Sequence, residues 1–219
     1  VNWLVLNDDI RESLVTRNRN VKYLPWCYID GDYFTVSADI NEVVRDADIV
    51  FVAMPSAFMK KFLDPLTESL KDKIVVSAVK GIIPGDYLTI VEHIHKYYDV
   101  PMANLAVVTG PSHAEEVAQL QLSYLTVASE SVENAETVRN LLANEYFRCS
   151  ISNDVLGVEV AAIMKNVYAL AVGIAVGLRF GDNFLAVLIS CCAGEMRRFI
   201  NEAVPIEERD INSAAYMGD

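Results

Sequence analysis

The sequence predicts an α/β protein, with an open, doubly wound sheet over residues 1–153 and an all-α region over residues 154–219. Short β-rich runs alternate with helical stretches as far as Asn153, which favours parallel strands joined by right-handed helical crossovers. Several of these runs are continuously apolar, as strands covered on both faces must be. After Asp154 the strand signals stop, and long apolar helices are expected instead.

Strands are expected at residues 2–6, 33–37, 49–54, 73–79, 104–109, 124–129 and 146–150, where β-branched and aromatic residues gather. Helices are expected between them, at residues 9–17, 41–45, 57–70, 86–97, 112–119 and 132–143, with Asp39 as the cap of the second. The all-α region should hold one long helix at 155–178, another from 181 to about 202, and a short one from Glu207. We therefore place a domain boundary between residues 153 and 154.

The overall charge limits the class of partner. The formal net charge of the 219 residues is −12 at pH 7, so the chain has no excess of lysine and arginine to neutralise nucleic-acid phosphates. A nucleic-acid partner is therefore not expected. A small phosphorylated substrate is compatible with this charge if a few local cations and backbone N–H groups hold it.

The cysteines and histidines give no sign of a metal site. The four cysteines show neither a C-x-x-C spacing nor the density of a disulfide framework, and with the three histidines they form no metal-ligand pattern. We therefore expect no bound metal and a reducing, cytoplasmic location. The most apolar run, residues 167–178, is too short to span a bilayer, so no membrane span is expected.

Two predicted strand ends carry residues that could contact a ligand. Strand 49–54 leads into Pro55 and Ser56, and strand 73–79 leads into Lys80. Open α/β sheets bind ligands at the carboxyl ends of their strands, where a lysine can hold a phosphate or carbonyl oxygen. The alternatives are an ordinary strand-to-helix turn at Pro55 and a solvated surface lysine at Lys80.

A third strand end is more specific. Residues 110–118, with the sequence GPSHAEEVA, combine a turn glycine, a proline and a predicted helix that opens on Ser112 with two acids in its first turns. The bare N–H groups at such a helix start favour an anion. A well-capped helix without a ligand is the simpler alternative.

Lys165 lies in the apolar run AAIMKNV, residues 161–167. Its helix neighbours are apolar on nearly every face, so its ammonium group has little polar surface to join. Poor solvation would make its proton unusually available, as a general acid requires. The alternative is an apolar stem that extends the ammonium group to the surface. Lys165 and the anion site together indicate chemistry on a small phosphorylated or carboxylated substrate.

Six motifs occur in order along the chain: DADIVFVAMPS at 46–56, SAVKGI at 77–82, GPSHAEEVA at 110–118, GVE at 157–159, MKN at 164–166 and GDN at 181–183. Together they resemble the bacterial type of NAD(P)-dependent glycerol-3-phosphate dehydrogenase, and the GPSHAEE block is the most specific part. The resemblance covers essentially the whole chain. It implies a Rossmann-like sheet and an oxidoreductase that interconverts dihydroxyacetone phosphate and sn-glycerol 3-phosphate with NAD or NADP, for glycerophospholipid synthesis.

The resemblance also implies roles for single residues. Lys165 would be the catalytic acid that protonates the forming alkoxide, and the base in the reverse direction. The substrate would be contacted by Lys80, Gly110, Ser112, Lys165 and Asp219. The cofactor would be contacted by Lys80, Ala114, Pro55 and Ser56.

The sequence departs from the family pattern in three places. No G-x-G-x-x-G turn occurs, the chain stops before the family's Ser-Arg-Asn motif, and Leu6 stands where many relatives carry an arginine at the adenosine end of the cofactor. The last departure slightly favours NAD over NADP. We expect an incomplete copy of a longer enzyme, in which either a homodimer or a fuller helical domain covers the apolar helix faces. A hydroxy-acid dehydrogenase of the same architecture and a non-catalytic binding remnant are the alternatives.

Overall fold

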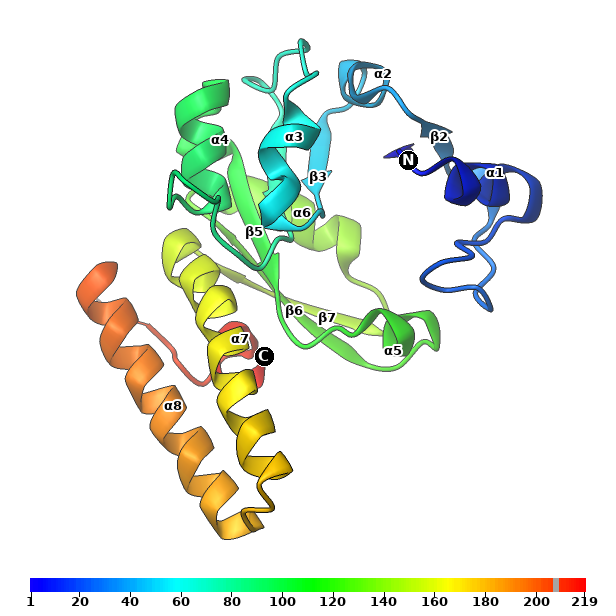
Figure 1. Cartoon of the computed structure of the whole chain (residues 1–219). Coiled ribbons are helices and arrows are strands. Elements are labelled where there is room, and N and C mark those ends of the chain that lie inside the picture. Colours follow the sequence, from blue (N-terminus) through cyan, green and yellow to red (C-terminus); the bar gives the residue numbers. More distant parts are fainter. Residues whose placement is uncertain (207–208) are drawn as a thin grey trace.

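The computed structural model describes residues 1–206 and 209–219. Its main sheet has the strand order β3–β4–β5–β6–β7, and β1 pairs with β2 in a separate sheet (Figure 1). The strands are β1 Asn2–Leu4, β2 Thr35–Ser37, β3 Ile49–Val52, β4 Ile74–Ser77, β5 Leu105–Thr109, β6 Ser123–Ser129 and β7 Phe147–Ser152. Each overlaps an expected strand. The antiparallel pairing of β5 with β6 is a departure from the otherwise parallel arrangement.

The helices around the sheets are α1 Asp8–Arg17, α2 Ile40–Arg45, α3 Met59–Leu63, α4 Ile90–Tyr98, α5 Ala114–Ala118 and α6 Val132–Leu142. Side-chain caps fix several of their starts. Asp39 accepts a hydrogen bond from the backbone N–H of Asn41 at 2.8 Å, as the expected cap of α2. At α4, Thr89 and Glu92 form a reciprocal capping box, so this helix begins at Ile90, later than the expected residue 86.

The helix expected over residues 57–70 is wrong in length. After a 3-10 turn at Ser56–Phe58, α3 ends at Leu63. Pro65 explains the stop, because its nitrogen carries no hydrogen for the next helical bond and its ring crowds the preceding turn. The segment after α3 is bound by a residue of α2: the side-chain oxygen of Asn41 accepts a hydrogen bond from the backbone N–H of Thr67 at 2.7 Å.

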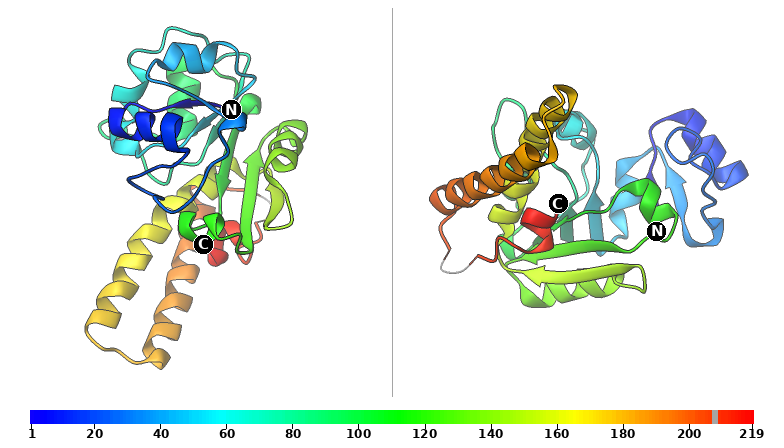
Figure 2. Two further views of the ribbon diagram at one scale, coloured as in Figure 1. Left: turned by 90° about the vertical axis from the view of Figure 1, so that its right-hand side faces the viewer. Right: turned by 90° about the horizontal axis from the view of Figure 1, so that it is seen from below.

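Two long helices, α7 (Val155–Gly177) and α8 (Asp182–Ala203), form a hairpin that projects from the sheet (Figures 1 and 2). They match the helices expected at 155–178 and 181–202. A short π-helical turn, Ala214–Gly218, then returns the chain to the side of α7 and β6 (Figure 2). The short helix expected from Glu207 begins outside the described residues.

Among the described residues, α7 is a helix long and apolar enough, by length and composition alone, to cross a membrane. Most of the apolar run of residues 167–178 therefore belongs to a longer helix, which also includes residues 155–166. Such a helix is weak evidence for a membrane span, since core helices pass the same test. Its first half is in fact packed against the sheet, where Val158, Ala161 and Ala162 are buried.

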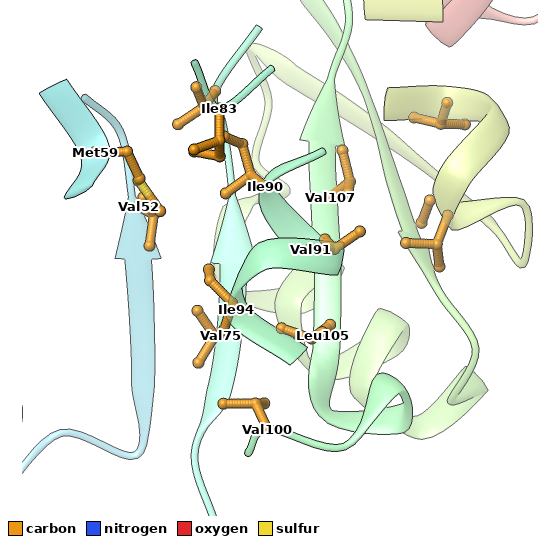
Figure 3. Packing of buried hydrophobic residues seen from close by; sticks show 14 of the residues in the cluster. Val52, Met59, Val75, Ile83, Ile90, Val91, Ile94, Val100, Leu105 and Val107 are labelled. Atoms are coloured by element: carbon orange, nitrogen blue, oxygen red, sulfur yellow. The ribbon is translucent and has the colours of Figure 1, made fainter. Parts of the chain in front are cut away.

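Apolar side chains cover both faces of the main sheet. On one face, Val75 and Leu105 pack with α3, α4 and the start of α7 (Figure 3). On the other face, Val76 and Ala106 pack with Val138 of α6. Successive residues of a strand point to opposite faces, so this two-sided burial explains why the strand sequences are continuously apolar.

Candidate active site

Four segments that are distant in sequence meet at the carboxyl edge of the sheet. The strands β3, β4 and β5 are parallel and end at the same edge. Lys80 follows the end of β4, and Thr109 is the last residue of β5. Helix α7 packs against β5 and brings Lys165 to this edge, and the C-terminal turn beside α7 delivers Asp219.

The carboxylate of Asp219 is the centre of this group. Its Oδ1 lies 2.5 Å from Nζ of Lys165, and its Oδ2 lies 3.6 Å from Nζ of Lys80. The hydroxyl group of Thr109 donates a hydrogen bond to Oδ2 at 3.1 Å. The side chain of Asp219 is 4% exposed, against 18% for Lys165 and 35% for Lys80. Lys165 therefore does not extend freely into solvent, and one buried carboxylate holds two ammonium groups that remain partly accessible.

The charges of this group suit an anionic oxygen. Burial lowers the pKa of Lys80 below its ordinary value, and the neighbouring Lys165 lowers it further, whereas the charge of Asp219 acts in the opposite direction. An ammonium group with a lowered pKa gives up its proton more readily. The two ammonium groups can stabilise a developing negative charge, and the lowered pKa of Lys80 makes its proton easier to transfer.

The loop after β5 differs from the expected helix start. Gly110 has φ +140°, and a Cβ here would overlap the carbonyl oxygen of Tyr124, so only glycine fits the position. The helix does not open on Ser112: its hydroxyl group donates to the carbonyl oxygen of Gly110 at 3.2 Å. Helix α5 begins at Ala114, with His113 as its N-cap residue. Because α5 has only five residues, its start provides no strong anion site.

The residues predicted to contact a cofactor lie in loops along the same edge. Ser56 follows β3 and approaches Gly81 so closely that a Cβ on the glycine would overlap the serine hydroxyl group. Pro55 and Ala114 are exposed. Within residues 1–206 and 209–219, none of the hydrogen bonds or ion pairs links Pro55, Ser56 or Ala114 to the two lysines. Their contact with a cofactor stays a prediction.

A second ionisable group is fully buried on α7. The side chain of Glu159 accepts hydrogen bonds from the backbone N–H groups of Ile90 at 3.0 Å and Val91 at 3.4 Å. It therefore caps the start of α4 from another segment of the chain. Burial raises the pKa of Glu159 to about 7, although these hydrogen bonds oppose the rise.

Sequence reasoning missed the residues that hold Asp219 in place. The sequence marks Thr109 only as the end of a strand. A buried polar network of Asp154, Arg209 and Tyr216 also joins the first turn of α7 to the C-terminal segment. Asp154 lies 55 residues from Arg209 and 62 residues from Tyr216, so no local spacing could have indicated these contacts.

Comparison with known proteins identifies related sequences. The family model described as NAD-dependent glycerol-3-phosphate dehydrogenase N-terminus matches residues 1–135, and the C-terminus model of the same family matches residues 154–219. The glycerol-3-phosphate dehydrogenase (NAD(P)+) of Agathobacter rectalis is 36% identical over 189 residues, which cover 86% of this chain and 55% of that protein. The Thermobifida fusca enzyme of the same name is 34% identical over 212 residues, which cover 96% of this chain and 62% of that protein.

The fold is similar to that of a solved relative. The glycerol-3-phosphate dehydrogenase of Coxiella burnetii superposes with a TM-score of 0.88 at 25% identity, over 100% of this chain and 66% of that one. The prediction of a Rossmann-like sheet followed by an all-α region is therefore confirmed. The chain spans 55% and 62% of the length of the two curated relatives.

Proposed function

We propose that the whole protein, of which this chain is part, interconverts dihydroxyacetone phosphate and sn-glycerol 3-phosphate with NAD or NADP. The premise is that the chain belongs to the NAD-dependent glycerol-3-phosphate dehydrogenase family. The observation that carries the proposal is the placement of Lys80 and Lys165 against the buried Asp219 at the carboxyl edge of the sheet. This edge is where open α/β sheets bind their ligands. Two cations beside a single carboxylate suit a phosphorylated, carbonyl-containing substrate.

Lys165 is the proposed general acid. In the direction of reduction, its ammonium group donates a proton to the substrate carbonyl oxygen as that oxygen becomes an alkoxide, and in oxidation its amine takes the proton back. Asp219 holds the ammonium group in place through their hydrogen bond. Lys80 stabilises the negative charge on the same oxygen, and Gly110 and Ser112 complete the substrate contacts.

A nicotinamide cofactor supplies or accepts the hydride when it is bound. The residues proposed to hold it are Pro55, Ser56, Lys80 and Ala114, which follow β3, β4 and β5 at one edge of the sheet. The close approach of Ser56 to Gly81 fits this role. The loops after β3 and β4 lie together there, and only small side chains separate them. The choice between NAD and NADP belongs to residues at the adenosine end, where Leu6 slightly favours NAD.

The whole protein has further proposed properties. We place its dinucleotide-binding domain in residues 1–153 and its helical domain in residues 154–219, in a cytoplasmic enzyme that serves glycerophospholipid synthesis. Exposed apolar side chains on α7 and α8 support a homodimer. A hydroxy-acid dehydrogenase and a non-catalytic remnant are not favoured, because both family models and both curated relatives carry the name of the same enzyme.

The test follows NADH and NADPH oxidation by the whole protein supplied with dihydroxyacetone phosphate. Lys165→Ala should lower kcat roughly 10²- to 10⁴-fold, the usual contribution of a general acid. Lys71→Ala is the matched control, because Lys71 is exposed just before β4, at the opposite edge of the sheet. A full rate in Lys165→Ala would overturn the role of this lysine. A folded native protein that oxidises neither cofactor with this substrate would overturn the function.

A further inference from the structure

A buried polar network ties the C-terminal segment to the first turn of α7. The carboxylate of Asp154 accepts hydrogen bonds from Arg209, at 2.5 Å from Nε to Oδ2 and 3.2 Å from Nη2 to Oδ1, and from the hydroxyl group of Tyr216. The side chains of Asp154 and Arg209 are each 3% exposed. Burying a charged pair is costly unless its geometry is good and its remaining polar atoms are satisfied.

The polar atoms of this network are well satisfied. Oδ1 of Asp154 also accepts from the backbone N–H of Gly157 at 3.1 Å, so the same carboxylate caps α7. Nη1 of Arg209 donates to the side-chain oxygen of Asn201 at 2.5 Å, and Nη2 donates to the carbonyl oxygen of Val204 at 2.8 Å. A Cβ at Gly157 would overlap the Asp154 carboxylate, which shows how tightly it lies on the helix. The carboxylate is therefore held in one orientation.

The network fixes the segment that carries Asp219 at two points. Arg209 lies at the start of this segment, and Tyr216 lies in the turn that ends immediately before Asp219. Lys165 lies on the same helix as the anchor, roughly 16 Å along its axis from Asp154 at 1.5 Å per residue. Helix α7 thus carries Lys165 and is capped at its start by Asp154, and both side chains contact the C-terminal segment.

We propose that Asp154, acting through Arg209 and Tyr216, is a positioning residue that sets the carboxylate of Asp219 against Lys165 and Lys80. Its consequence for catalysis rests on the proposed function. The effect of Asp154 on the lysines is independent of that function. Even without bound substrate, a looser network should let the carboxylate of Asp219 move away from Lys165. The ammonium group of Lys165 then loses its carboxylate partner and reacts more readily with an amine reagent.

The variants are chosen to separate positioning from folding. Asp154→Asn is the obvious change, but it leaves the Arg209 charge buried without its counter-charge, which is strongly destabilising. Tyr216→Phe removes only one hydroxyl group and keeps the buried ring. Tyr168→Phe is the matched control, because the hydroxyl group of Tyr168 on α7 is buried with no hydrogen-bond partner among the residues the structure describes.

The readout is the rate of reductive methylation of each lysine, followed by mass spectrometry. In Tyr216→Phe the rate at Lys165 should rise about tenfold, as expected for loss of a hydrogen bond to a charged group. Lys73 reports on global unfolding, because its Nζ is held by the carbonyl oxygens of Ala47 at 2.7 Å and Arg45 at 3.1 Å. An unchanged rate at Lys165, or an equal rise at Lys73, would overturn the proposal.

Kinetics of the whole protein supply a second readout. Tyr216→Phe should lower kcat for dihydroxyacetone phosphate more than it raises KM, because a misplaced Asp219 disturbs proton transfer more than binding. Tyr168→Phe should match the native protein, and equal losses in both variants would overturn the positioning role. If methylation changes as expected but the native protein does not turn over this substrate, the positioning stands and the proposed function fails.

Discussion

Nζ of Lys165 and Oδ1 of Asp219 lie 2.5 Å apart, although 54 residues separate them in the sequence. The lysine belongs to α7, and the aspartate follows the C-terminal turn. Thr109, at the end of β5, contacts the same carboxylate. The carboxylate of Asp219 therefore joins the sheet to the helical region at one point, and the position of Lys165 there depends on how these parts are held together.

Replacing Asp219 by asparagine keeps the size of the side chain and removes the charge that both lysines face. The charge of Asp219 raises the pKa of Lys80 against burial and Lys165, so Asp219→Asn should lower the pKa of Lys80 further. We expect the titration midpoint of Lys80, followed by NMR of ¹³C-methylated lysines, to move to lower pH. Thr109→Val removes only a hydrogen bond to the carboxylate and should move it much less. A midpoint that stays in place or rises in Asp219→Asn contradicts this prediction.

The strand ends of the site could be predicted from the sequence, because a buried strand is a continuous apolar run that turn residues interrupt. This signal placed Lys80 and Gly110 at the carboxyl edge. The same local patterns failed where one residue changed the backbone. Pro65 ends α3 inside the segment 57–70, whose pattern otherwise predicts one helix. Serine is a good helix-capping residue, but the hydroxyl group of Ser112 instead donates a hydrogen bond to the carbonyl oxygen of Gly110.

The long-range polar contacts could not be predicted from one sequence. Glu159 caps α4 through N–H groups that lie 68 and 69 residues away, and Asp154 binds Arg209 across 55 residues. Periodicity reports which face of a helix is apolar, but it does not report which segment covers that face. A buried carboxylate in an apolar run is a sign that some partner exists, without naming it.

Glu159 should make the stability of the protein depend on pH. Its pKa is raised from 4.5 to about 7 in the folded state, so between these values the unfolded chain loses a proton that the folded chain keeps. Stability should therefore fall as the pH rises through this window, by about 3 kcal/mol in total from this group. Glu159→Gln cannot ionise and keeps an oxygen for the N–H groups of Ile90 and Val91, so it should lose this dependence.

Urea unfolding at pH 5 and pH 8 measures the effect. Relative to the native protein, Glu159→Gln should gain stability at pH 8, and the gain should be smaller at pH 5. Glu136→Gln, an exposed site on α6, should keep the native pH dependence. If native protein and Glu159→Gln lose the same free energy between the two pH values, Glu159 does not titrate in this window.

Gly110→Ala should destabilise the fold for two reasons, the backbone conformation of this residue and the lack of room for a Cβ. The position has φ +140°, and the new Cβ would overlap the carbonyl oxygen of Tyr124. We expect a loss of about 2 kcal/mol or more in the free energy of unfolding. Gly173→Ala is the control: a Cβ there on α7 meets nothing within 4 Å, so it should stabilise the helix by roughly 0.5–1 kcal/mol. Equal stability of the two variants in urea would refute the steric argument.

The hairpin should mediate self-association if the apolar side chains on α7 and α8 form a dimer interface. Leu170 on α7 and Val187 on α8 are 66% and 62% exposed, and each covered apolar Å² contributes roughly 25 cal/mol. Leu170→Lys with Val187→Lys should therefore convert an associated protein to monomer in light scattering. Val15→Lys makes the same kind of change at a side chain that is 65% exposed on α1, and should leave association unchanged. A native protein that stays monomeric at high micromolar concentration rules the hairpin out as a dimer interface.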